Sequence, residues 1–370
     1  MQTNLQFGSD LAVKRWSPAL YVEIKQQSYF APRFISENDT NIIQQKNDLE
    51  GAAGDTVTYD LSARLRQQPT TGDNRLEGKE ENLRFYSDRI KIDQLRHAVS
   101  AGGQMTRQRT EHDLRSSAKA RLGEYMAQMF DELLFIYLSG TRGNNPDYIY
   151  PVGYVGHAGN PIEAPDNGHM MFGGDAKSKS ELTADAKMSC KVIERAVLKA
   201  RTMKQKSPDA AAFPPVTIGG EEHYVCVMSP AQEYDMRTGD KAGWLDIQKA
   251  AAAAEGRKNP IFKGGLGMYN KVILHSHEKV ISGTGGADDK LPTARALFLG
   301  RQAGAIAYGG NKRKGSTGKG TRFSWVEKID DFDNEPKIAA GAIVGFKKTR
   351  FNDVDYATIA IDTAAATTDI

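Results

Sequence analysis

The sequence predicts an α+β protein, and three observations indicate this class. Residues 56–65 alternate between apolar and polar side chains, which is the period of a half-buried strand. Residues 105–138 contain no proline, and their later half repeats apolar residues at the spacing of an amphipathic helix. Strand-like runs return at 342–351 and 356–362. Strands near both ends of the chain with helices between them are typical of an α+β fold.

The first 48 residues predict an extended arm that lies on another surface. Apolar residues are scattered here and interrupted by Pro18 and Pro32. Only one short helix has a start signal, from Pro18 to Gln27, with Ser17 as its N-cap.

Two strands at 56–65 and 82–93 predict a long hairpin whose polar tip spans Gln67 to Glu81. An isolated hairpin is marginally stable in water, so its apolar face needs a cover. No third strand is predicted directly after it. We therefore expect the cover to come from another subunit.

The segment from Met105 to Leu138 predicts one long helix with a single glycine, Gly123. Its 34 residues would extend about 51 Å. A compact globule of this chain length would be only about 54 Å across. We therefore expect one helix to run nearly the whole length of the molecule.

The remaining segments predict a mixed lobe. Residues 141–180 are rich in Gly, Asn, Pro and His, which indicates a surface excursion. Thr183 is the expected cap of a helix over 184–204, and Ser229 with Gln232 forms a capping box for a helix ending near Arg237. A further helix is predicted over 244–255. Strands are predicted at 223–228, 271–280, 295–299 and 321–328, in addition to the two C-terminal ones.

Charge and composition exclude several classes of protein. Lys and Arg total 49 and Asp and Glu total 46, a net charge of +3, which argues against a protein whose main role is to grip nucleic acid. The two cysteines, Cys190 and Cys226, cannot form a disulfide framework, so a reducing compartment is expected. No segment approaches the roughly 18 apolar residues of a membrane span, and no targeting segment is apparent. We expect a soluble protein with no membrane partner.

The glycine-rich run at 309–321 resembles a phosphate-binding loop, but its spacing fails because Gly318-Lys319 is followed by glycine. A nucleotide-binding enzyme would depend on this run alone. A flexible basic surface loop is favoured, with non-specific phosphate contact left open. Its basic residues, which form the candidate DNA-facing set, are Lys312, Arg313, Lys314, Lys319 and Arg322.

No other pattern predicts a catalytic, metal or cofactor site. His275 and His277 would share one face of a strand, but no third ligand can be named, so surface or interface histidines are favoured. The acidic cluster Asp330, Asp331, Asp333 and Glu335 lacks the Gly and terminal Glu of a calcium loop and predicts a solvated turn. Cys190 lies on a helix stripe, where an inert core thiol is expected. We expect no enzyme and no cofactor.

The order of parts is itself informative: an arm, a long hairpin, a long helix, an α/β lobe and closing strands. This order resembles the major capsid proteins of tailed bacteriophages, whose fold also builds encapsulin shells. Several stretches resemble the N4-phage-type major capsid family across nearly the whole chain. They are AVKRWS at 12–17, GDTVT at 54–58, GD at 72–73 with LEGKEE at 76–81, IDQLR at 92–96, NPIF at 259–262 with GLGMY at 265–269, and GFKK at 345–348.

The resemblance implies the tailed-phage and encapsulin type of capsid fold, with peripheral and axial domains. Its expected parts are an N-terminal arm at 1–48, an E-loop hairpin at 49–95, a spine helix of the peripheral domain at 96–140, a surface insertion at 141–180, an axial domain at 181–310, and a basic loop with closing strands at 311–370.

The resemblance further implies that subunits contact one another through the hairpin and the arm. The expected hairpin and hinge residues are Gly51, Gly54, Val57, Tyr59, Leu61, Arg75, Glu77, Glu80, Glu81 and Phe85, and the expected arm residues are Trp16, Tyr21 and Phe30. The glycines at the hairpin base would let one sequence serve two ring sizes.

The implied function is a structural subunit that assembles into hexamers and pentamers of an icosahedral phage head around double-stranded DNA. The implied partners are other copies of the chain, scaffolding, portal and decoration proteins, and the packaged DNA. Assembly is expected in the host bacterial cytoplasm, and the finished protein in the virion. The alternative is an encapsulin-like cellular shell that encloses cargo.

Overall fold

The structure is a computed structural model of the 370-residue chain. It describes residues 24–62, 65, 67–83, 85–111, 113–206, 213–239, 244, 260–262, 265–311, 320–332 and 334–365. The predicted helix at 18–27 is therefore described only at its end, where residues 24–27 are helical. The predicted helix at 244–255 falls outside the described residues except for Trp244.

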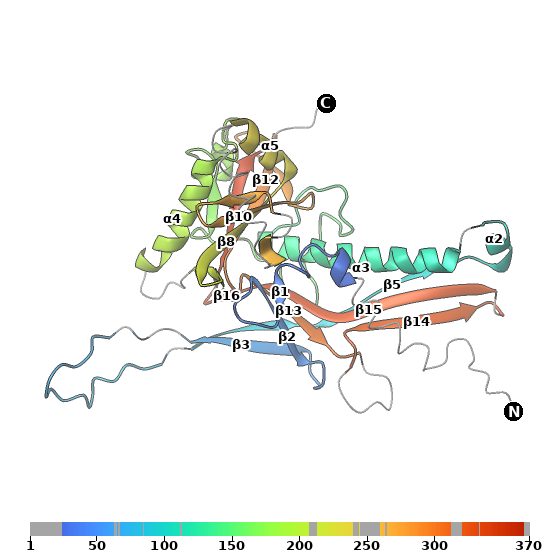
Figure 1. The fold of residues 1–370 in the computed structure, drawn as a ribbon, viewed down its shortest axis with the longest axis horizontal. Helices are drawn as coiled ribbons and strands as arrows, with labels where there is room; N and C mark the ends of the chain where they lie inside the picture. Colours follow the sequence, from blue (N-terminus) through green and yellow to red (C-terminus); the bar gives the residue numbers. More distant parts are fainter. Residues whose placement is uncertain are drawn as a thin grey trace.

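A six-stranded sheet runs along the long axis of the molecule (Figure 1). Its organising strand is β15 (Glu335–Lys348), which pairs along one edge with β14 and then β13, and along the other with β5. The remaining strands of this sheet are β1 (Ile35–Ser36), β2 (Ile43–Leu49), β5 (Asp93–Ser100), β13 (Gly304–Gly309) and β14 (Phe323–Asp330). Neither β2 nor β13 was predicted from the sequence.

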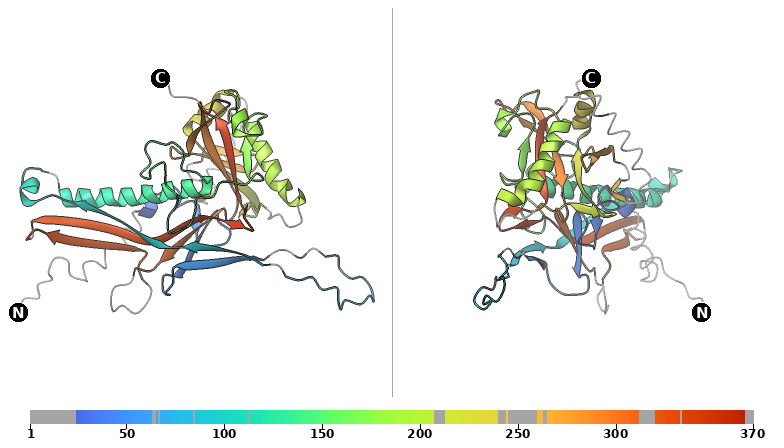
Figure 2. Two further views of the ribbon diagram at one scale, coloured as in Figure 1. Left: turned by 180° about the vertical axis from the view of Figure 1, so that it is seen from behind. Right: turned by 60° about the vertical axis from the view of Figure 1, so that its left-hand side comes forward.

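A second, eight-stranded sheet forms a separate lobe above one end of this layer (Figures 1 and 2). Its main path is β6 (Met170–Phe172), β18 (Thr358–Ala364), β12 (Leu291–Leu299), β8 (Glu221–Met228), β10 (Val272–Ser276) and β9 (Gly267–Tyr269). β11 (Ser282–Gly285) and β7 (Val216–Ile218) pair at its edges. The lobe has its own hydrophobic core, which α4 (Cys190–Lys206) helps to form.

Short elements complete the described chain. They are the hairpin strands β3 (Thr56–Ser62) and β4 (Phe85–Lys91), the ribbon β16 (Arg350–Phe351) with β17 (Val354–Asp355), α5 (Pro230–Gly239), and the 3₁₀ turns η1 (Lys179–Glu181) and η2 (Pro260–Phe262). Within the described residues, no helix combines the length and apolar character needed to cross a membrane.

The prediction of one helix over 105–138 is wrong, because the chain forms two. A short α2 (Gln104–Gln108) precedes α3 (Leu114–Ser139). Asp113 starts α3 as its N-cap, and its carboxylate accepts hydrogen bonds from the backbone N–H groups of Arg115 at 3.0 Å and Ser116 at 3.2 Å. The 26 residues of α3 extend about 39 Å.

The expectation that no strand follows the hairpin is also wrong. β5 begins two residues after β4 ends and pairs with β15 from Asp93↔Val344 to Ser100↔Lys337. One side of β5 is exposed and carries charged residues. On its inner face Leu95 and Val99 are half-buried, and His97 between them stacks on Tyr125 of α3. The range predicted as a spine helix, 96–140, thus begins as a strand.

Two helix starts in the lobe have different outcomes. The capping box at Ser229 is confirmed, since Gln232 N–H donates to Ser229 Oγ at 3.2 Å and Ser229 N–H donates to Gln232 Oε1 at 2.9 Å. The predicted start at Ala184 is wrong, because α4 begins at Cys190. Ala186 instead accepts a hydrogen bond from the backbone of Ala364, which extends the edge of β18.

Residues 141–180 are more buried than a surface excursion would be. Arg142, Asn145, His157, Asn160 and His169 are all buried. The Arg142 guanidinium donates to three backbone carbonyls, and His157 Nε2 lies 2.9 Å from the carbonyl oxygen of Val344 in β15. The segment also supplies β6, so it joins the lobe to the long sheet.

Asp131 of α3 anchors the described end of the arm. Its buried carboxylate accepts hydrogen bonds from Ser28 Oγ at 2.7 Å and from the backbone N–H groups of Tyr29 at 2.7 Å and Phe30 at 3.2 Å. Burial raises the pKa of Asp131 to about 6, although the three hydrogen bonds oppose this shift.

Aromatic rings continue this anchor into the lobe. Tyr29 stacks on Phe135 of α3, and its ring centroid lies 4.3 Å from that of His277, which follows β10. His275 is fully buried against Phe34, so the expectation of surface histidines is wrong for it. Burial lowers the pKa of both histidines to about 4. We call Tyr29, Phe34, Phe135, His275 and His277 the arm junction.

Replacing Asp113 with alanine should lower the free energy of unfolding measurably, because two backbone N–H groups of α3 lose their acceptor. The measurement is urea unfolding of the unassembled subunit followed by circular dichroism. Glu111→Ala is the matched control, since Glu111 is an exposed carboxylate just outside the cap. Equal losses in the two variants would contradict the assignment of the cap.

The arm junction should make the subunit sensitive to acid. The pKa of histidine in the unfolded chain is about 6.5. As the pH falls from 6.5 to 4, the unfolded chain therefore takes up protons that buried His275 and His277 in the folded subunit do not. The free energy of unfolding then decreases. Asp131 acts in the opposite sense, because its native pKa lies above its unfolded value, but one carboxyl offsets only one histidine.

His277→Gln should therefore flatten this fall by at most about 1.4 kcal/mol per pH unit, measured by urea unfolding at a series of pH values. His97→Gln, an exchange of an exposed histidine, is the control. An unchanged slope in His277→Gln would show that this histidine does not stay neutral in the folded subunit.

Candidate intersubunit surfaces

The root of the hairpin is covered by its own chain. β3 and β4 pair in register from Thr56↔Lys91 to Ser62↔Phe85. Val57 and Tyr59 are buried in the main hydrophobic core, where the Tyr59 ring meets Phe351 edge to face and its hydroxyl donates to Asp88 at 2.9 Å. These two residues are thus unavailable as contacts for another subunit, and the prediction that another subunit covers this face is wrong at the root.

Residues distant in sequence fix the direction of the root. Asn160 holds the backbone of Lys91 in both directions, donating to its carbonyl oxygen at 2.8 Å and accepting from its N–H at 3.0 Å. A Cβ at Gly345 would lie 2.0 Å from that same carbonyl oxygen, so only glycine lets β4 cross β15 here. Two residues after Gly345, Lys347 of β15 forms an ion pair with Asp88 of β4.

Beyond its root the hairpin projects away from the body of the subunit, at the opposite end of the long axis from α2 (Figures 1 and 2). Four large apolar side chains on it are exposed, each by more than 60%: Leu65, Leu76, Leu83 and Phe85. Of these, the sequence had singled out only Phe85. The signal for the others was an apolar residue within an otherwise polar segment. Such exposure on a projecting element is typical of an interaction surface.

Polar residues shape the tip of the hairpin. Arg75 and Glu77 form an exposed ion pair. Glu80 accepts a hydrogen bond from the Gly78 N–H at 2.8 Å, and Glu81 accepts one from the Gln67 N–H at 2.8 Å, which joins the two arms of the tip. These residues therefore hold the shape of the tip and also present negative charge outward.

The predicted hinge lies directly after a tightly held turn. Gly51 and Gly54 are exposed, and Gly54 has φ +145°. Just before them, the backbone carbonyl oxygens of Leu49 and Glu50 accept hydrogen bonds from Gly310 at 3.1 Å and Gly320 at 2.8 Å. The chain thus changes from a fixed to an exposed segment at residue 51.

Arg322 stabilises this turn and is a poor candidate for DNA contact. Its guanidinium pairs with Glu50 and lies 3.1 Å from Glu37 Oε1. It also lies over the ring of Tyr308. Because two carboxylates balance its charge, the assignment of Arg322 as a DNA-facing cation is not supported by its surroundings.

The remaining predicted contact residues divide into two groups. Phe30 is fully buried beside Asp131 and Phe135, so it anchors the arm within its own subunit and cannot contact another. The others, Trp16, Tyr21, Lys312, Arg313, Lys314 and Lys319, lie outside the described residues, as does the side chain of Leu61.

The described residues contain no cluster of three or more His, Cys, Asp or Glu that could hold a metal ion. Asp331 is exposed in the turn between β14 and β15, which agrees with the predicted solvated turn. Asp330 and Glu335 lie at the strand ends on either side, where Lys328 and Lys337 pair with Asp330, and Asp333 is not described. Cys190 and Cys226 are buried, and burial raises the pKa of the Cys226 thiol to about 12.

Comparison with known proteins assigns the family. The profile of the family described as phage capsid protein matches residues 4–367. The major capsid protein of Pseudomonas phage KPP25 is 25% identical over 364 residues, covering 92% of this chain and 89% of that protein.

Solved structures agree with this assignment. The capsid of Ralstonia phage GP4 has a chain that is 52% identical, with a TM-score of 0.87 and full coverage of both chains. The capsid of cyanophage Pam1 shares the fold at 22% identity, with a TM-score of 0.67 over 92% of this chain and 93% of that one. These likenesses support a phage capsid subunit over a cellular shell or a nucleotide-binding enzyme. The chain belongs to the phage capsid protein family and is a phage major capsid protein.

Proposed function

We propose that copies of this chain assemble into hexamers and pentamers that close an icosahedral head around double-stranded DNA, with the hairpin as the joint between neighbouring subunits. The observation that carries the proposal is the projecting hairpin with its four exposed apolar side chains. Their burial on a neighbour would contribute to the 1,200 to 2,000 Å² that stable interfaces typically remove from water. Head-to-tail contacts of one surface with another generate a closed ring when the rotation from one subunit to the next closes.

The proposed contact set follows from where the residues lie. Phe85, Arg75, Glu77, Glu80 and Glu81 would touch the neighbour, together with Leu65, Leu76 and Leu83. Gly51 and Gly54 would adjust the hairpin to the two ring sizes, because they follow a turn that is already fixed to the body. Since Val57 and Tyr59 hold the root of the hairpin in the core, the change of angle at these glycines would have to be small.

Further partners are part of the proposal. Scaffolding, portal and decoration proteins would act during or after assembly in the host bacterial cytoplasm. DNA would be held by geometry with non-specific contact, since the chain carries a net charge of only +3. Lys312, Arg313, Lys314 and Lys319 are the proposed DNA-facing cations. The role is structural, without catalysis and without a cofactor.

Electron microscopy of the purified protein tests the central proposal. We expect rings or shell-like particles whose abundance rises with protein concentration or on addition of a scaffolding protein. The physical reason is that the hairpin buries its apolar side chains only on another copy. A strictly monomeric protein under all of these conditions would overturn the proposal.

Deletion of Gln67 to Glu81 tests the hairpin itself. The shortened subunit should fold, because Val57, Tyr59 and Ile90 remain in the core, but it should not close shells. Circular dichroism and thermal unfolding report folding, and electron microscopy reports closure. Leu198→Ser is a control, since it removes an equally exposed apolar side chain from α4. Intact particles from the deletion variant would show that the hairpin is not the joint.

A further inference from the structure

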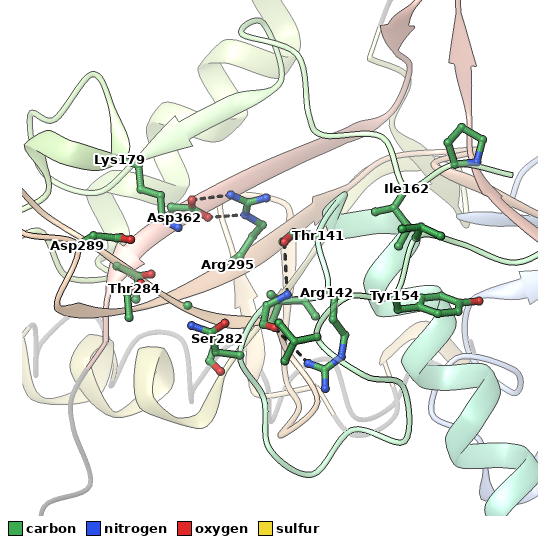
Figure 3. Close-up of a pocket in the computed structure, with 18 residues that line it drawn as sticks. Thr141, Arg142, Tyr154, Ile162, Lys179, Ser282, Thr284, Asp289, Arg295 and Asp362 are labelled. Atoms are coloured by element: carbon green, nitrogen blue, oxygen red, sulfur yellow. Dashed lines mark hydrogen bonds and ion pairs between the residues drawn. The ribbon is translucent and has the colours of Figure 1, made fainter.

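The lobe and the segment after α3 enclose a polar hollow of about 650 Å³ (Figure 3). In Figure 3, Lys179, Thr284 and Asp289 lie toward one side of the hollow, and Tyr154 and Ile162 toward the other. Two exposed valines stand at its apolar side, Val152 at 66% and Val155 at 81% exposure. The hollow thus combines an apolar rim with charged walls, which we call the basic hollow.

The charge of the basic hollow is positive. Asp362 and Arg295 balance each other's charge, because the Arg295 guanidinium donates to both carboxylate oxygens of Asp362 at 2.7 Å. Arg142 donates only to backbone carbonyls, so within the described chain no carboxylate neutralises it. Lys179 is exposed and has no carboxylate partner among the described residues. Lys179 is therefore the exposed cation of the hollow and Asp289 the further acid among its lining residues, while buried Arg142 adds a positive charge behind the wall.

A neighbouring hollow of about 840 Å³ has the opposite charge. It shares Ser282 and Thr284 with the basic hollow, so the two hollows lie side by side, and we call them together the groove. Its walls carry Glu124, Asp131, Asp147 and Glu278, and its one lysine, Lys279, already pairs with buried Glu132. Charge thus distinguishes the two ends of the groove.

The hairpin tip matches the basic end. Residues 67–83 carry four acidic and two basic side chains. Leu76 and Leu83 are each 62% exposed beside these charges. The tip therefore presents both properties that the basic hollow would recognise, negative charge and unburied apolar surface, whereas the acidic end of the groove would repel it.

We propose that the basic hollow is the receptor for the hairpin tip of a second copy of this chain. The tip projects away from its own body, so it reaches the hollow only on another molecule (Figure 1). The acids of the tip would lie against Lys179, and Leu76 would pack on Val152 and Val155. This inference rests on the proposed function, because it names the surface that the hairpin joint engages.

Site-directed cross-linking in assembled particles tests this receptor. Leu76→Cys with Val155→Cys, treated with a short bismaleimide, should give a ladder of covalent dimers and larger multimers on denaturing gels. Leu76→Cys with Val326→Cys is the matched control, since Val326 is exposed on β14, away from the hollow. Background should be low, because Cys190 and Cys226 are buried.

A charge exchange gives a second readout. Lys179→Glu and Asp73→Lys should each raise the concentration at which particles form by about three-fold, and the double variant should recover most of this loss. Lys191→Glu, which changes an exposed lysine on α4, is the control. Adding Asp73→Lys to it should not lower the concentration at which particles form.

The outcomes separate this inference from the proposed function. Intact particles that cross-link no better through Val155 than through Val326 would overturn the receptor and leave the shell function standing. Additive losses in the charge-exchange double variant would also overturn it. A wild-type chain that stays monomeric would overturn the proposed function and the receptor together.

Discussion

The packing of α3 against β15 is the interaction on which the rest of the subunit depends. From Leu122 onward α3 is nearly continuously buried, and Phe130 and Tyr137 meet Phe346 at ring-centroid distances of 5.6 and 6.4 Å. β15 in turn pairs with β5, β13 and β14. Since both edges of β15 are used, a shift of this strand would displace the whole long sheet.

The other functional parts are fixed to this pair by polar contacts. Asp131 on α3 holds the arm, and His157 and Asn160 connect β15 and the hairpin root to the segment that follows α3. These contacts are buried, where an unpaired polar group is costly, so each fixes one geometry. The hairpin therefore leaves the body in a defined direction although the described residues of its tip are mostly exposed.

Local patterns explain which features could be predicted from the sequence. The alternation at 56–65 identified β3, and Ser229 with Gln232 identified the start of α5, because both signals depend only on neighbouring residues. The order of the parts identified the capsid fold. By contrast, β5 is a strand because it pairs with β15, which lies more than 230 residues later in the chain. Most of its side chains are exposed, so its sequence lacks a clear alternation of apolar and polar residues. Burial of His275 likewise depends on Phe34 from the arm, and no local pattern reports that contact.

The predicted contact residues are wrong where an apolar side chain belongs to the core of the subunit and not to an interface. Val57, Tyr59 and Phe30 are apolar because they belong to the subunit core. Leu76 and Leu83 are exposed, but the polar residues around them in the sequence give no sign of an apolar surface. A sequence cannot separate these cases, since burial within one chain and burial between chains require the same side chains.

The close contact between Gly310 and Gly320 has a consequence for protein engineering. A Cβ on Gly320 would lie 2.5 Å from the carbonyl carbon of Gly310, and Asn311 and Thr321 pair beside them. The chain is thus closed at this point regardless of the length of sequence between the two glycines. Extra residues there add little loop-closure entropy and do not move β13 or β14. An insertion between the two glycines should therefore leave the fold of the subunit intact.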